Sequence, residues 1–150
     1  MNKPIIYGVF DSAENINQCT GGTFDNSLAS NLAFSDFLHF KSDDEILLFA
    51  GDLYNADELE KLTGCATTNH AELLFALYKK SGYQGFKMIN GKFTIIIQSN
   101  NQTIAARDRY GLGPMFYYTD KVFTNHLYQL KDFKNVNLTP DLDAIGTYLM

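Results

Sequence analysis

Short apolar runs separated by polar stretches dominate the sequence and predict strands more often than helices. Residues 4–10 form an apolar run that opens on proline, as the start of a strand allows. Residues 45–50 form a continuous apolar run, which is typical of a strand buried on both faces. The apolar residues recur less regularly over 33–40, where we also predict a strand. The stretch 11–33 is rich in Asn, Ser, Gly and Thr, which predicts a loop.

A first helix is predicted over residues 56–62. Asn55 followed three residues later by Glu58 is the pattern of a helix start with a capping box, in which each side chain binds a backbone N–H of the first turn. Gly64 then ends the helix, because glycine readily adopts the left-handed conformation that follows a last turn.

A second helix is predicted to begin after Asn69, with Glu72 repeating the capping box, and to end at Gly82. Its apolar residues recur on one side, so this helix is expected to bury that side in the core. They are Leu73, Leu74, Leu77 and Tyr78.

The second half of the chain predicts two hairpins. Residues 92–98 and 103–108 flank a polar turn, and residues 115–119 and 122–126 flank Asp120-Lys121. Residues 142–150 have a helical apolar pattern. Strands before and after a central pair of helices favour an α+β fold, and specifically a layered αββα domain, over a doubly wound sheet.

Composition and charge restrict the function. Apolar residues make up 45% and charged residues 19% of 150 residues, which indicates one globular domain. A net charge of −5 without clusters of Lys and Arg argues against nucleic acid and anionic membranes as partners. The apolar runs are too short to span a membrane, and the N-terminus lacks a signal peptide. Cys19 and Cys65 fit neither a disulfide framework nor a metal site, so we predict free thiols in a reducing, cytoplasmic compartment.

A glycine turn follows an adjacent Arg and Asp near the end of the chain. Arg107 and Asp108 stand at a strand end, and Gly111 to Pro114 form the turn. Three interpretations compete: a phosphate loop, an active-site corner and a conformational device. A phosphate loop needs a helix start after it, whereas a strand is predicted here, and Pro114 lacks an N–H donor. We favour a structural turn that is held by Arg107 and Asp108 as a partly buried pair.

The stretch Ala50-Gly51-Asp52 connects a buried strand to the first helix. Glycine at a strand end lets a ligand approach the backbone, and its N–H can point into a pocket. Asp52 could then hold an amine of the ligand. The alternative is a tight turn in which Asp52 is only a cap.

Taken together, these motifs resemble the N-terminal glutamine amidotransferase domain of asparagine synthetase. The matching segments occur in the same order as in that family: IIYGVFD (5–11), AGDLYN (50–55), NHAELLFALYKKSG (69–82), MINGKFTIII (88–97) and ARDRYGLGPMFYY (106–118). The resemblance implies the αββα sandwich of N-terminal nucleophile hydrolases. It also implies a domain over 1–138, with 139–150 starting a linker helix toward a C-terminal synthetase domain.

The departures from the family motifs imply that glutaminase chemistry is lost. In the family, an N-terminal Cys attacks the glutamine amide with its own amine as base. That position is Pro4 here, so no catalytic residue is predicted. The family's oxyanion-hole Asn falls on Ala50 and its amine-binding Asp on His70, while Asp52 replaces a Glu. The family's Arg for the glutamine carboxylate has no counterpart. Ala50, Gly51, Asp52 and His70 are therefore predicted to line a vestigial pocket, and Arg107, Asp108, Gly111 and Pro114 to form a structural corner.

The main functional hypothesis is a degenerate amidotransferase domain of an ATP-dependent amide-forming enzyme. In lacking the nucleophile, it resembles the corresponding domains of β-lactam synthetases and lasso-peptide cyclases. The substrates of those enzymes supply their own amine. No cofactor or metal is then expected in this chain, and ATP and magnesium belong to the synthetase domain. The expected partner is that C-terminal domain or a separate chain, and the sequence leaves oligomerisation open.

Two alternatives remain. The first is a stand-alone binding module that uses the vestigial pocket or the aromatic residues Tyr117, Tyr118 and Phe123. The second is a hydrolase with Ser12 or Thr20 as nucleophile and one of the histidines as base. Lone histidines far apart in sequence are more often surface or core residues, so we rank this alternative last.

Overall fold

The computed structural model describes residues 5–9, 32–35, 37–99, 102–113, 117–118, 122–125, 139, 142 and 147. Two four-stranded antiparallel sheets organise them. The larger sheet has the strand order β3-β4-β5-β6, and its long central strands pair along their whole length. Its strands are β3 (Leu38–Ser42), β4 (Glu45–Leu53), β5 (Gly91–Ser99) and β6 (Gln102–Arg107).

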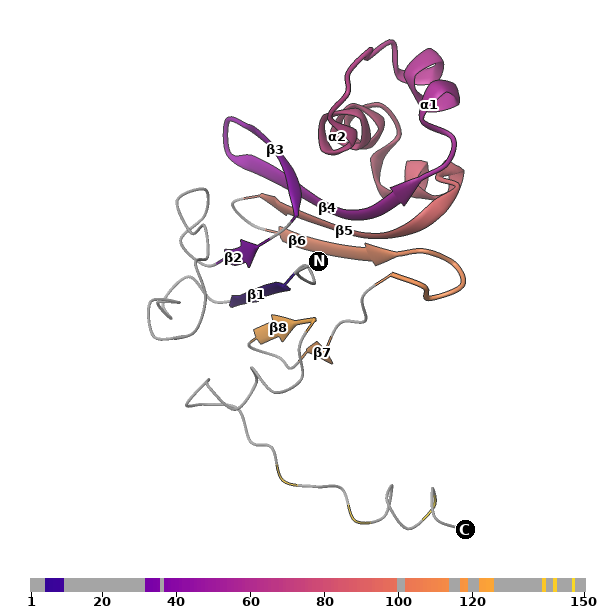
Figure 1. Cartoon of the computed structure of the whole chain (residues 1–150). Coiled ribbons are helices and arrows are strands. Elements are labelled where there is room, and N and C mark those ends of the chain that lie inside the picture. Colours follow the sequence, from indigo (N-terminus) through magenta and orange to yellow (C-terminus); the bar gives the residue numbers. More distant parts are fainter. Residues whose placement is uncertain are drawn as a thin grey trace.

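The second sheet joins segments from both ends of the chain, in the order β2-β1-β8-β7. It consists of β1 (Ile5–Val9), β2 (Leu32–Ser35), β7 (Tyr117–Tyr118) and β8 (Val122–Thr124). Figure 1 shows this sheet on the side of the larger sheet that faces away from the helices. The predicted hairpin around Asp120-Lys121 is confirmed, because β7 pairs with β8 in the antiparallel sense.

The helices cover one face of the larger sheet (Figure 1). They are α1 (Ala56–Thr63), α2 (His70–Ser81) and the 3₁₀ segment η2 (Gly82–Met88). The apolar side of α2 packs on alternate residues of β4 and β5, so that one buried cluster joins helix and sheet. Its fully buried members include Leu47, Phe49, Leu73, Leu74, Leu77, Ile95 and Ile97.

The predicted α+β class is confirmed by these layers of helices, sheet and sheet. A second helical layer, as the αββα arrangement has, is not seen among the described residues. Leu142 and Thr147 have helical backbone, which agrees with the helical pattern predicted there, and the rest of 142–150 lies outside the described part. None of the helices in the described part of the chain has the length and apolarity needed to cross a membrane.

The strand predicted over 33–40 is wrong as a single element. The chain leaves one sheet with β2 and enters the other with β3, so the two halves of the segment belong to different sheets. Phe37, between them, is buried. The irregular apolar period reflects this change of sheet, because each half presents its side chains to a different neighbour.

The two predicted capping boxes also differ from expectation. Asn69 does cap α2, since its side chain accepts a hydrogen bond from the Ala71 N–H at 3.0 Å. Glu72 instead accepts from the Thr67 hydroxyl at 2.6 Å, and that hydroxyl accepts from the Asn69 N–H. Thr67 therefore relays the contact that the capping box would make directly.

Asn55 makes no side-chain cap at α1. Its amide donates to the Met88 carbonyl at 3.0 Å and its oxygen accepts from the Asn90 N–H at 2.9 Å. Glu58 lies 3.4 Å from the same amide. The side chain of Asn55 therefore fastens the start of α1 to the segment that enters β5, because that segment supplies better-placed partners than the helix does.

Candidate functional site

Ala50 lies near the end of β4 and is buried, with 6% of its surface exposed. Its neighbour Phe49 packs into the cluster under the helices. Side chains alternate along a strand, so the Ala50 methyl group leaves β4 on the face away from the helices. A methyl group offers no hydrogen bond, and the only donors that this stretch can supply to a ligand are backbone N–H groups.

Gly51 is required by the geometry of this strand end. Its φ is 133°, and a Cβ atom added there would lie 2.0 Å from the carbonyl oxygen of Lys92 on β5. Any side chain would push the two strands apart. The close approach at Gly51 is made by β5, and the approach of a ligand to this backbone stays a prediction.

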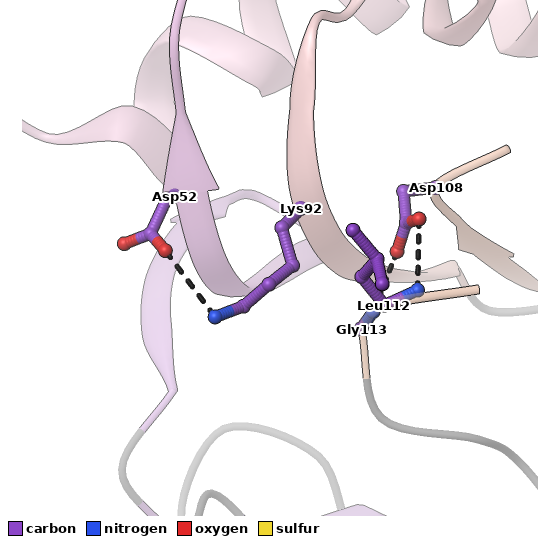
Figure 2. Close-up of polar contacts among 5 residues, drawn as sticks. All are labelled: Asp52, Lys92, Asp108, Leu112 and Gly113. Carbon is purple, nitrogen blue, oxygen red and sulfur yellow. Dashed lines mark hydrogen bonds and ion pairs between the residues drawn. The ribbon is translucent and has the colours of Figure 1, made fainter. Parts of the chain in front are cut away.

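Asp52 lies beside Lys92 across the strand pair, and their charged atoms are 3.5 Å apart (Figure 2). Both side chains are largely exposed, at 61% and 46%. Water screens such a pair, which contributes well under about 1 kcal/mol to stability. Asp52 therefore has a cation beside it, and the N-cap position of α1 is occupied by Asn55 instead.

His70 begins α2 and is half-buried. Its ring lies edge-on to the ring of Phe49, with 6.0 Å between centroids. Phe49 points toward the helices, whereas Ala50 points to the opposite face of the sheet. The structure therefore does not bring the side chains of His70 and Ala50 together, and their joint role in a vestigial pocket stays a prediction.

Arg107 closes the turn that follows β6. Its guanidinium donates to the carbonyl oxygen of Gly111 and, at 2.8 Å, to that of Gly113. Its Nε is buried without a hydrogen-bond partner. Gly111 has a φ of 68°, in the left-handed region that favours glycine. The predicted turn exists in the described part, and Pro114 lies outside it.

Asp108 is buried, with 4% of its surface exposed, and its carboxylate accepts three backbone N–H groups of the turn. The N–H of Gly113 lies at 2.6 Å and that of Leu112 at 2.9 Å (Figure 2). The N–H of Tyr110 lies at 3.1 Å. Burial raises the pKa of this carboxyl, but the backbone hydrogen bonds around it, those of Leu112 and Gly113 foremost, together hold the pKa below its ordinary value.

Arg107 and Asp108 thus act on the turn separately. The ion pairs among the described residues join Lys92 to Asp52 and Lys79 to Glu45, and none joins Arg107 to Asp108. Adjacent residues at a strand end point in different directions, so Arg107 binds carbonyl oxygens and Asp108 binds N–H groups of the same turn. The predicted mutual pair is replaced by two side chains that each bind the backbone.

Phe93 on β5 connects the two glycine motifs. A Cβ atom on Gly113 would lie 2.2 Å from its carbonyl oxygen, and one on Gly51 would lie 2.8 Å from its Cα. The same carbonyl accepts the backbone N–H of Asp108 at 3.1 Å. Both motifs therefore approach the backbone of one residue, from β4 on one side and from the turn after β6 on the other.

The structure describes two cavities, and neither has Ala50, Asp52 or His70 in its lining. The first, of about 460 Å³, is lined by Phe86, Lys87, Met88, Ile89, Asn90, Gly91, Phe93, Arg107, Arg109 and Tyr110. We call it the basic cavity. The second has the same volume and is lined by Tyr83, Phe86, Thr103, Ile104, Ala105 and Ala106. We call it the β6 hollow.

Sequence reasoning did not predict the basic cavity, although it singled out one of its residues, Arg107, as part of the structural corner. The signal was present, because Lys87, Arg107 and Arg109 are three of only 12 basic residues in an acidic chain. These side chains come together because η2 and the turn after β6, about 20 residues apart in sequence, line the same cavity. The sequence pattern predicted neither η2 nor its position beside the turn.

Cys65 is a free thiol in the link between α1 and α2, as predicted, and Cys19 lies outside the described residues. Burial raises the pKa of the Cys65 thiol, and the nearby carboxylates of Glu72 and Glu60 raise it further. Within the described ranges, His, Cys, Asp and Glu residues form no group of three or more that could hold a metal ion.

Comparisons with known proteins identify relatives of this chain. At 29% identity over 114 residues, it resembles a protein named as a glutamine-hydrolysing asparagine synthetase in Methanocaldococcus jannaschii, covering 70% of this chain and 22% of the relative. It is 30% identical over 71 residues to carboxyethyl-arginine β-lactam synthase of Streptomyces clavuligerus, covering 46% and 14%. It is 29% identical over 124 residues to an amidase of Penicillium rubens, covering 78% and 18%. The chain thus spans at most 22% of the length of these relatives.

Among solved structures, the chain is similar to glutamine phosphoribosylpyrophosphate amidotransferase from B. subtilis, with 25% identity and a TM-score of 0.49 over 63% of this chain and 25% of that one. The family model described as a glutamine amidotransferase domain matches residues 36–150, which is more than half of the chain. This chain belongs to the glutamine amidotransferase domain family.

Proposed function

We propose that this chain is a glutamine amidotransferase domain that has lost glutaminase activity. The observation that carries the proposal is Ala50, a buried residue with a methyl side chain at the position of the family's oxyanion donor. Only the Gly51 N–H is left there to stabilise an oxyanion. The loss of one such donor costs a working enzyme about 3–4 kcal/mol in the transition state.

The nucleophile position supports the same proposal. The residue that corresponds to the family's catalytic Cys is Pro4, whose side chain carries no nucleophile. Cys65 is a poor substitute, because its raised pKa keeps it as the neutral thiol and it lies in the link between α1 and α2. Glutamine hydrolysis through a thioester therefore lacks a thiolate in the described part of the domain.

We further propose that the domain is the N-terminal part of an ATP-dependent amide-forming enzyme in the cytoplasm. The chain covers a small fraction of its relatives, and two of these are named as a synthetase and a synthase. Residues 1–138 would form the domain, and 139–150 would start the linker to the synthetase domain. ATP and magnesium would act only in that second domain, on a substrate that carries its own amine.

A glutaminase assay tests the first proposal. The chain is incubated with glutamine, and both ammonia and glutamate are measured against buffer. We expect no turnover above buffer. Turnover that either Cys65→Ser or His70→Ala abolishes would overturn the proposal, because it would identify a working residue in this chain.

Sequencing the gene beyond residue 150 tests the second proposal. An adenylating domain in the same reading frame supports the amide-forming parent enzyme. A stop codon directly after Met150 would instead favour the stand-alone binding module.

A further inference from the structure

The basic cavity combines three cationic side chains, and none of its described lining residues carries a carboxylate. Lys87 and Arg109 are exposed, and Arg107 is held in place by the carbonyl oxygens of the turn. The nearby Asp108 does not neutralise them through an ion pair, because its carboxylate oxygens bind backbone N–H groups. In a chain with a net charge of −5, this cavity is a local concentration of positive charge that attracts an anionic group.

The wall and rim of the basic cavity combine polar and apolar side chains. Phe86 and Phe93 are buried in the wall, while Met88 and Tyr110 are exposed by 48% and 79%. Exposed apolar side chains around a charged cavity suit a ligand that also has apolar groups. A bare inorganic anion would leave these side chains in water.

The β6 hollow adjoins the basic cavity, because Phe86 lines both. It runs beside residues 103–106 of β6, and its described lining residues carry no charge. Tyr83 is 62% exposed at its edge. Moreover, β6 is the end strand of its sheet. An extended peptide is the ligand that can place a carboxylate in one cavity and an apolar side chain in the next.

We propose that the basic cavity and the β6 hollow together bind an extended acidic peptide segment of a partner polypeptide. A Glu or Asp carboxylate of that segment binds beside Lys87 and Arg109, and a neighbouring apolar side chain occupies the β6 hollow. We choose an acidic segment as the ligand because its negative charge is complementary to these cations. Peptide binding at this surface does not depend on whether the domain hydrolyses glutamine.

The test uses the ¹⁵N-labelled 150-residue chain and an acetylated, amidated peptide of sequence Glu-Leu-Glu-Leu-Glu. NMR titration should shift the backbone amides of Lys87, Met88 and Tyr110, together with those of residues 103–106. A matched Gln-Leu-Gln-Leu-Gln peptide should bind at least about tenfold more weakly, because it keeps the shape and loses the charge.

Charge reversal on the chain provides the second measurement. Lys87→Glu and Arg109→Glu should each weaken binding of the Glu peptide by about tenfold or more. Lys61→Glu makes the same charge change on the exposed side of α1 and should leave binding unchanged. Equal binding of both peptides, or equal loss in the Lys61→Glu control, would overturn the proposal. It would also be overturned if inorganic phosphate alone produced the same shifts as tightly, since the site would then take a small anion.

Discussion

The carboxylate of Asp108 accepts the backbone N–H of Gly113 at 2.6 Å, five residues further along the chain. This contact, with those to Leu112 and Tyr110, places a buried negative charge at the centre of the turn after β6. Leaving such N–H groups without their charged acceptor lowers the free energy of unfolding by far more than an exposed ion pair contributes to it. The stability of the turn should therefore depend on this one side chain.

We expect Asp108→Ala to lower the free energy of unfolding by about 1–3 kcal/mol, because three backbone N–H groups lose their acceptor. Urea titration followed by circular dichroism measures the change. The control is Asp52→Ala, which removes an exposed carboxylate and should change the free energy by less than about 0.5 kcal/mol. Equal effects of the two substitutions would contradict a specific role of the turn.

Stability should also depend on pH through Asp108. The folded-state pKa of this carboxyl is lower than its ordinary value of 3.8. The ionised carboxylate therefore stabilises the fold fully at pH values above 3.8. The contribution is lost as pH falls through the lower, folded-state pKa. The difference in unfolding free energy between the natural chain and Asp108→Asn should therefore shrink from pH 6 to pH 2.5. A constant difference over this range would show that the carboxylate charge is not responsible.

Replacing either glycine beside Phe93 should destabilise the domain. Gly113→Ala places a Cβ atom 2.2 Å from the Phe93 carbonyl oxygen, and Gly51→Ala places one 2.0 Å from that of Lys92. We expect each to cost at least about 1–3 kcal/mol, the usual range for overpacking, or to prevent folding. Thermal unfolding measures the effect.

Gly64→Ala is the matched control for the glycine substitutions. Its φ of 76° is strained for alanine, but no atom lies within 4 Å of the added Cβ. It should cost about 1–2 kcal/mol from the left-handed conformation alone. If Gly51→Ala lowers the stability less than Gly64→Ala does, β4 and β5 can separate easily at this end.

The Cys65 thiol should react slowly at neutral pH in the folded chain. Burial and the carboxylates of Glu72 and Glu60 raise its pKa, so the reactive thiolate is scarce until the pH is higher than a free cysteine requires. Timed alkylation and mass spectrometry should show slow labelling at this position, and two labels on the unfolded chain without prior reduction. Substituting Glu72→Gln should speed the reaction. Labelling as fast as a model peptide would contradict the raised pKa.

Sequence reasoning succeeded where local patterns decide the structure. The apolar side of α2 follows from residues three and four apart, and the buried centre of β4 from one continuous run. The family motifs identified the domain before its fold was known. These features depend on neighbours in sequence or on a pattern that the whole family shares.

The errors arise where a distant segment competes for a side chain. Asn55 and Asn69 look alike in sequence, yet only Asn69 caps its helix, because Asn55 meets Met88 and Asn90. The break between β2 and β3 depends on a second sheet, and the basic cavity needs η2 to lie beside the turn after β6. The separate directions of Arg107 and Asp108, by contrast, follow from strand alternation and were predictable.

The contacts of Gly51 and Gly113 with the backbone around Phe93 have a consequence for how this domain can evolve. A side chain at either glycine would displace β5, and the displaced strand would no longer fit the glycine on its other side. The two positions, 62 residues apart in sequence, are thus mechanically coupled through a single strand. In divergent copies of this domain we expect them to change together or not at all, even after selection for chemistry has ceased.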